Sequence, residues 1–106
     1  MSQFENVTVK KEANVYFDGK VTSRAIEFPN GETKTLGIMQ PGDYEFGTET
    51  AELMEITRGS LMLQLAGDEG WTEVKGGESF DVPAKSSFKV VVEEVTDYVC
   101  SYIKDV

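Results

Sequence analysis

The chain has 106 residues, the usual size of one domain and too few for two separate hydrophobic cores. Its 19 acidic residues outnumber its 10 basic residues, and the resulting net charge of -9 disfavours binding to nucleic acid or to an anionic membrane surface. We therefore expect no nucleic-acid partner. No apolar stretch reaches the roughly 18 residues that cross a bilayer, so we also expect no membrane partner and a cytoplasmic location.

The sequence contains no histidine and one cysteine, Cys100. Catalysis by a Ser–His or Cys–His pair is therefore excluded, as are an internal disulfide and most transition-metal sites. Because no imidazole can activate it, the Cys100 thiol is predicted to be buried and structural.

The first 13 residues carry no clear strand pattern, and we expect a flexible segment over 1–13 followed by one domain over 14–106. Along that domain, apolar and polar side chains alternate with a period of two, which indicates strands. In chain order, strands are expected over 52–57, 60–65, 78–82, 87–93 and 97–103. The stretch 45–55 has some helical propensity but is interpreted as a loop that leads into a strand.

Turn-forming residues separate these strands. They are Pro29-Asn30-Gly31, Gln40-Pro41-Gly42-Asp43, Arg58-Gly59, Ala66-Gly67-Asp68-Glu69-Gly70 and Lys75-Gly76-Gly77. Strands then recur about every ten residues, which leaves no room for the helical crossovers of a parallel sheet. The sequence therefore predicts an all-β, antiparallel sandwich or barrel.

Two segments resemble the two signatures of cupin barrels. Glu52 precedes Gly59 by seven residues, and Gly77 precedes Pro83, at the intervals of that family. The resemblance implies a single-domain cupin, which is a jelly-roll-like antiparallel β-barrel.

The chain departs from the cupin pattern where cupins carry metal-binding histidines. Thr48 and Thr50 occupy the region of the first two histidines, and Phe88 stands where the last one would be. A lone Glu52 cannot hold a divalent transition metal, because three or more ligands must converge on the ion. We therefore expect no metal.

Four blocks, 16–24, 37–48, 80–88 and 98–102, occur in the order and at the separations of one bacterial family. The chain thus resembles the small cupin-type pyrimidine/purine nucleoside phosphorylases from about residue 14 to its end. The resemblance implies an enzyme that cleaves purine and pyrimidine nucleosides with inorganic phosphate as co-substrate, giving a free base and a pentose 1-phosphate without a metal or organic cofactor.

A non-catalytic cupin that binds a sugar or a nucleotide is the alternative. A cupin isomerase or dioxygenase is disfavoured because those chemistries usually rely on histidine or a metal. Cupins of this size commonly pair, so a homodimer is expected.

Phosphorolysis through a transition state of oxocarbenium character needs cations for phosphate, an acceptor near the sugar and a platform for the base. Lys20 and Arg24, on an expected N-terminal strand, are the first candidates for phosphate, and Arg58 and Lys85 are the second; each can also be a solvated surface charge. Glu52 is the catalytic candidate, because in the metal-bearing relatives this position points into the barrel. There it can accept hydrogen bonds from ribose or stabilise positive charge, or else pair with a cation at the barrel mouth.

Hydroxyl and aromatic side chains supply the remaining candidates. Thr48 and Thr50 can offer hydroxyls to phosphate or sugar, or serve a turn or strand. Phe46, Phe80 and Tyr98 can stack on a base, or belong to the core. On the last strand, Tyr98 shares one face with the cysteine and the final tyrosine, and we interpret that face as core or subunit contact.

Overall fold

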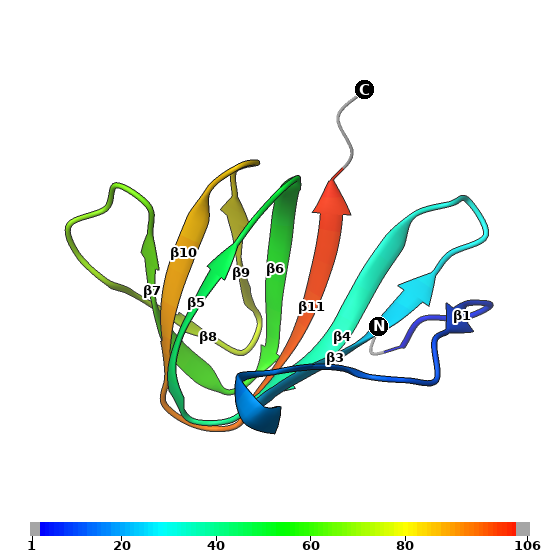
Figure 1. Cartoon of the computed structure of the whole chain (residues 1–106), viewed down its shortest axis with the longest axis horizontal. Coiled ribbons are helices and arrows are strands. Elements are labelled where there is room, and N and C mark those ends of the chain that lie inside the picture. The colour runs from blue at the N-terminus through cyan, green and yellow to red at the C-terminus, as the bar shows by residue number, and fades with distance from the viewer. Residues whose placement is uncertain (1–2, 104–106) are drawn as a thin grey trace.

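The computed structural model describes residues 3–103, which form eleven strands and one short 3-10 helix (Figure 1). The elements are β1 (Thr8–Val9), β2 (Asn14–Tyr16), η1 (Phe17–Gly19), β3 (Val21–Glu27), β4 (Thr33–Met39), β5 (Gly42–Gly47), β6 (Ala51–Arg58), β7 (Ser60–Leu65), β8 (Thr72–Lys75), β9 (Glu78–Val82), β10 (Ser87–Val92) and β11 (Thr96–Ile103). Within these described residues no helix is long and apolar enough to cross a membrane.

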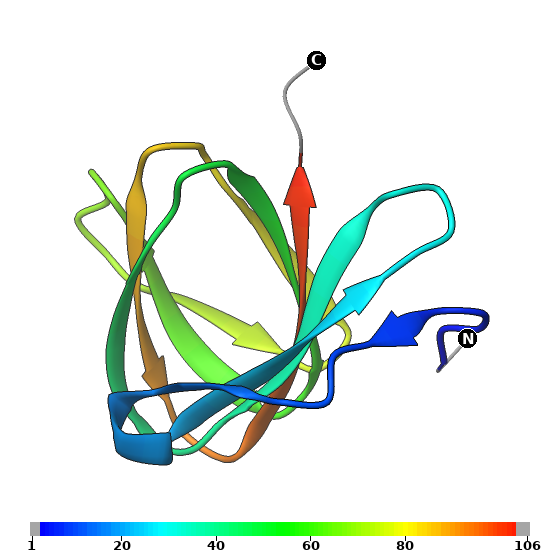
Figure 2. The same cartoon turned by 45° about the vertical axis from the view of Figure 1, so that its right-hand side comes forward.

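The strands form two antiparallel sheets. The larger sheet has the order β1-β3-β4-β11-β6-β9, with β2 also paired to β3, and the smaller sheet has the order β5-β10-β7-β8. Figure 2 shows the two sheets curving around a common interior. The predicted all-β, antiparallel fold class is confirmed.

The five predicted strands correspond to β6, β7, β9, β10 and β11. The interpretation of 45–55 as a loop leading into a strand was correct for its second half only. β5 continues to Gly47, and β6 begins at Ala51. β3 corresponds to the N-terminal strand expected to carry Lys20 and Arg24, for which no bounds were predicted; Lys20 lies just before it. β1, β2, β4, β5 and β8 were not predicted, although β4 lies beside β11 at the centre of the larger sheet.

Part of the segment 1–13 lies on the larger sheet. Thr8 pairs with Glu27 in β3, and the Lys10 backbone N–H donates to the Ala25 carbonyl at 2.9 Å. The Phe4 ring packs edge-on against Phe28, with 5.2 Å between centroids. The flexibility of 1–13 stays a prediction, and residues 1–2 and 104–106 lie outside the described residues.

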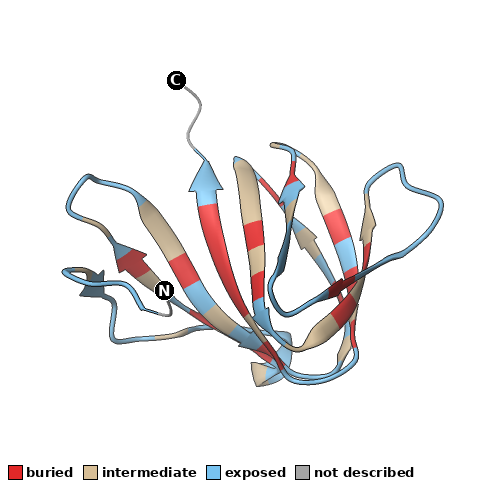
Figure 3. Ribbon diagram, turned by 180° about the vertical axis from the view of Figure 1, so that it is seen from behind, coloured by how far each residue is buried: buried red, intermediate tan, exposed pale blue. Residues whose placement is uncertain are grey.

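Inner-facing side chains of both sheets form the core. β11 is buried along most of its length because it lies between β4 and β6 (Figure 3). One end of the interior is closed where β6 turns into β7 at Gly59, whose φ is +104°. A Cβ there would collide with the side chain of Thr96, so this close approach requires glycine.

Candidate active site

A cavity of about 440 Å³ lies between the two sheets. Inner-facing side chains of β3, β4, β6 and β11 line it from the larger sheet, and side chains of β5 and β10 line it from the smaller one. Tyr16 and Phe17, at the junction of β2 and η1, complete the lining. Its volume is within the range of small-molecule sites.

One wall of the cavity is polar because register places hydroxyl, thiol and carboxyl groups on neighbouring strands. Residues directly opposite one another in an antiparallel ladder share a face of the sheet. In β11, Tyr98 lies opposite Gly37, Cys100 opposite Thr35, and Tyr102 opposite Glu52. The polar wall consists of Ser23, Thr35, Glu52, Tyr98, Cys100 and Tyr102.

Gly37 makes room for the Tyr98 ring. A Cβ at this position would lie 2.6 Å from the Tyr98 hydroxyl oxygen and would also collide with the Thr22 carbonyl oxygen. The ring therefore lies across the backbone of β4, and a larger residue at position 37 would displace it.

Glu52 is the only member of the polar wall with a carboxyl group. Burial raises the pKa of its carboxyl group, and a hydrogen bond from Cys100 Sγ to Glu52 Oε1, at 3.4 Å, partly opposes that rise. The ion pairs among residues 3–103 are Lys10 with Glu27 and Lys75 with Glu73, so the described structure does not show the cation partner that was the alternative for Glu52.

The thiol and phenols beside Glu52 stay protonated at neutral pH. Burial raises the pKa of Cys100 to about 12 and that of Tyr102 to about 12, and it raises the pKa of Tyr98 as well. The Tyr102 hydroxyl lies 3.4 Å from Thr35 Oγ1. These groups therefore act as neutral hydrogen-bonding groups. The prediction that Cys100 is buried is confirmed, although its side chain also lines the cavity.

The opposite part of the lining is aromatic. Phe46 stacks on Phe88 with 5.4 Å between ring centroids, and Phe17 meets Phe46 edge-on at 5.5 Å. Phe17 also contacts Tyr44 at 4.9 Å. We call Phe17, Phe46 and Phe88 the aromatic wall.

Three of the predicted site residues line the cavity: Glu52, Phe46 and Tyr98. Phe80 is half-buried and packs edge-on against Phe88 at 5.8 Å, outside the lining. Thr48 is buried, but its hydroxyl donates to the Pro83 carbonyl at 2.7 Å and accepts from the Ser86 N–H at 3.0 Å. That hydroxyl therefore joins two loops in this structure.

The predicted phosphate-binding cations lie on the surface. Lys20, Arg24, Arg58 and Lys85 are all exposed, and none of them lines the cavity. Arg24 follows Ser23 in β3, so it points to the outer face, and its Nε donates to the Lys11 carbonyl at 3.3 Å. Their contact with phosphate stays a prediction.

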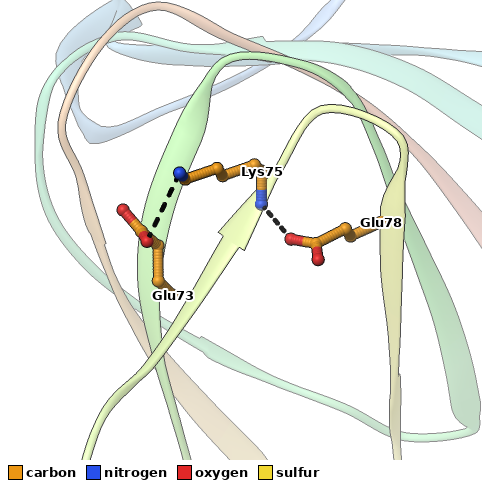
Figure 4. Close-up of polar contacts among 3 residues, drawn as sticks. All are labelled: Glu73, Lys75 and Glu78. Carbon is orange, nitrogen blue, oxygen red and sulfur yellow. Dashed lines mark hydrogen bonds and ion pairs between the residues drawn. The ribbon is translucent and has the colours of Figure 1, made fainter.

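Some acidic side chains far from the cavity have an ion-pair or hydrogen-bond partner, as the turn between β8 and β9 shows. There Lys75 Nζ lies 3.7 Å from Glu73 Oε1, and the Lys75 backbone N–H donates to Glu78 Oε1 at 2.7 Å (Figure 4). All three residues are exposed. By contrast, Glu45 and Glu52 line the cavity, and no cation within residues 3–103 does so.

The cupin fold implies a metal, but the side chains at the cavity do not fit one. Glu52 and Cys100 are neighbouring potential ligands, the Thr48 hydroxyl is occupied, and Phe88 has no ligand atom. Among residues 3–103 no group of three or more His, Cys, Asp or Glu side chains is placed to hold an ion.

Sequence reasoning missed Phe17, Ser23, Thr35 and Tyr102 as lining residues. Tyr102 could have been found, because it shares a face of β11 with Tyr98. Ser23 belongs to β3, for which no bounds were predicted, and Thr35 belongs to β4, which was not predicted as a strand.

Sequence comparisons give one family over most of the chain. Residues 11–102 match the profile described as pyrimidine/purine nucleoside phosphorylase. Two proteins with that name are similar to this chain. One, from Leptospira interrogans serogroup Icterohaemorrhagiae serovar copenhageni (strain Fiocruz L1-130), is 60% identical, and the other, from Sulfurovum sp. (strain NBC37-1), is 62% identical. The first match spans 99% of both chains, and the second spans 97% of this chain and all of the relative.

Solved structures agree on the fold. A protein of unknown function from Acinetobacter sp. ADP1 superposes with a TM-score of 0.93 at 40% identity, covering 95% of this chain and 98% of the other. A cupin superfamily protein from Desulfitobacterium hafniense DCB-2 gives a TM-score of 0.67 at 17% identity, covering 89% and 84%. The cupin fold predicted from the sequence is confirmed.

Proposed function

The chain belongs to the pyrimidine/purine nucleoside phosphorylase family, and we propose that it cleaves purine and pyrimidine nucleosides with phosphate, giving a free base and a pentose 1-phosphate, in the cavity between its two sheets. The observation that carries this proposal is the match to relatives of that name over nearly the whole chain. The cavity supports it, since it offers a carboxyl group, several hydroxyl groups and an aromatic wall.

In the reaction, the bond between C1′ of the pentose and the base nitrogen breaks, and a phosphate oxygen forms a new bond to C1′. The base leaves with the electron pair of the broken bond and takes up the proton that the attacking hydrogenphosphate loses, while positive charge develops on the sugar in the transition state. Glu52 accepts hydrogen bonds from the ribose hydroxyls and stabilises that charge. The neutral hydroxyls of Ser23, Thr35, Tyr98 and Tyr102 orient sugar and phosphate oxygens.

We assign the cationic phosphate contact to Lys20, which directly follows η1 and is close in sequence to the lining residues Tyr16 and Phe17. Its long side chain can reach phosphate there without being buried. Arg24 points to the outer face of β3, so we do not assign it a contact within its own chain. Replacement K20A should raise KM for phosphate and leave KM for the nucleoside unchanged.

The reaction needs no metal in this proposal, because the side chains at the cavity lack the ligands for one. The test incubates metal-stripped protein with uridine and with inosine, with and without phosphate, and follows release of free base. We expect release with both nucleosides only when phosphate is present. Release that depends on an added divalent cation would contradict the metal-free mechanism.

One observation favours a second candidate, a cupin that binds a sugar or nucleotide without turning it over. No cation within residues 3–103 lines the cavity, although a phosphate dianion is best held by cations. Binding of nucleoside without base release, in the presence of phosphate, would support this candidate over the enzyme.

We propose a homodimer in the cytoplasm, built on the outer face of the larger sheet. Val15, Leu36 and Ile38 are exposed on this face. Register also aligns Arg24, Leu36, Val99 and Glu55 in one row across β3, β4, β11 and β6. A two-fold axis through this row would place Arg24 of each copy against Glu55 of the other.

Replacement L36E should therefore convert a dimer to a monomer in light scattering; a monomeric wild-type protein would contradict the proposal.

A further inference from the structure

The hairpin turn between β2 and β3 brings a large ring to the rim of the cavity. Phe17 and Asp18 have φ values of 51° and 56°, in the left-handed region that bulky residues rarely adopt. The Lys20 N–H donates to the Phe17 carbonyl at 3.1 Å, and the Gln40 N–H donates to the Lys20 carbonyl at 2.8 Å. The first bond closes the turn on itself, and the second fastens it to the end of β4.

This conformation leaves Phe17 only partly covered. Its side chain is 43% exposed, yet it lines the cavity and contacts the rings of Tyr44 and Phe46. A phenyl ring gains most from full burial, so a ring that stays 43% exposed beside a cavity has apolar surface left for a ligand to cover.

The aromatic wall runs from the interior to the rim. Phe88 is 3% exposed, Phe46 is half-buried, and Phe17 is the most exposed of the three. Each ring contacts the next, at centroid separations of 5.4 Å for Phe46 and Phe88 and 5.5 Å for Phe17 and Phe46, with 30° and 90° between the ring planes. Phenyl rings have no hydrogen-bonding groups, so a ligand bound here would be recognised by its flat apolar face and not by its pattern of donors and acceptors.

We propose that the aromatic wall is the nucleobase subsite, and that Phe17 is the residue that lets one cavity accept both purines and pyrimidines. This inference rests on the proposed function. A single-ring pyrimidine covers less of the wall, whereas a two-ring purine covers more of it and reaches further toward Phe17. Stacking tolerates any base because every base has a π-face. The polar wall with Glu52 is left for the sugar, and Lys20 stays the proposed cationic contact for phosphate.

The test compares F17A with W71A in the full chain. Trp71 is a matched control because it is 44% exposed, like Phe17, but does not line the cavity. For F17A we expect KM for inosine to rise about tenfold and KM for uridine about threefold, with KM for phosphate and kcat within about twofold of wild type. W71A should match wild type.

Two further variants separate stacking from packing. F17L keeps an apolar side chain without a π-face and should behave like F17A, whereas F17Y should retain wild-type KM values. Unchanged KM values for both nucleosides in F17A and F17L would overturn the proposal. Equal rises in all three KM values, with lowered thermal stability, would also overturn it, because they would indicate a structural role.

The subsite can still be tested if the proposed function is wrong. Wild-type protein that releases no base with phosphate would refute the phosphorylase and not the subsite. Titration of inosine and uridine by ligand-observed NMR would then decide. Weaker binding of inosine to F17A than to W71A would support the aromatic wall, and equal binding would overturn it.

Discussion

The two ends of the interior are built from the same strands but filled differently. Near the Gly59 turn, Ile56, Thr96 and Val92 are at most 3% exposed and pack tightly. Toward the other end of the same strands, Glu52 and Tyr102 face the cavity. Alternation along a strand dictates which side chains point inward at both ends. It does not dictate whether the space between them is filled, and that difference separates the stabilising end from the candidate site.

The largest effect on folding should come from the closed end. Replacement I56A removes a side chain that is 1% exposed, and it should lower the free energy of unfolding by about 2–5 kcal/mol, because burial is lost and a void is left. Urea denaturation measures this change. The control V95A, at a position 54% exposed, should stay within about 0.5 kcal/mol of wild type. Equal losses of unfolding free energy in both variants would contradict the assignment of stability to the closed end.

At the cavity end, E52Q should reduce kcat/KM about 100-fold or more without unfolding the protein, since the lost carboxylate no longer stabilises positive charge on the sugar. Steady-state base release measures this effect. Turnover equal to wild type would remove Glu52 from the catalytic machinery and leave the fold assignment intact.

The same variant should have the opposite effect on stability. Burial raises the pKa of Glu52 in the folded state above its ordinary value of 4.5. Its favourable contribution is therefore complete below the pKa of the unfolded chain and is lost as the pH rises through the raised folded pKa. At pH 7, E52Q should unfold at the same or a higher temperature than wild type, and any advantage should shrink toward about pH 4. A lower melting temperature for E52Q at pH 7 would show that ionised Glu52 stabilises the fold.

The contrast between the two ends also explains what the sequence could predict. β7 and β10 were predicted because apolar residues alternate along them. β4 was missed, and β3 was expected only without bounds, because inner positions carry Ser23, Thr35 and Gly37, which line the cavity or leave room for Tyr98. The polar groups that make a site thus erase the hydrophobic alternation that identifies a strand.

The candidate site was predictable where spacing carried the information and not where local contacts decided. Glu52 followed from its interval to Gly59 in the cupin pattern. Thr48 was an equally reasonable candidate, but its hydroxyl joins two loops distant in sequence. Phe17 depends on a left-handed turn, for which a phenylalanine gives no signal.

The smallest effect should come from the thiol beside the carboxyl group. The hydrogen bond from Cys100 lowers the pKa of Glu52, so C100A should move that pKa further upward. If the ionised carboxylate is the active form, the acidic limb of the pH profile of kcat shifts to higher pH, while kcat on its plateau changes less than about threefold. C100S keeps a donor at this position and should restore the wild-type profile. Identical profiles for wild type, C100A and C100S would show that Cys100 fills space next to Glu52 without positioning it, and the thiol would then belong with the closed, packed end of the interior.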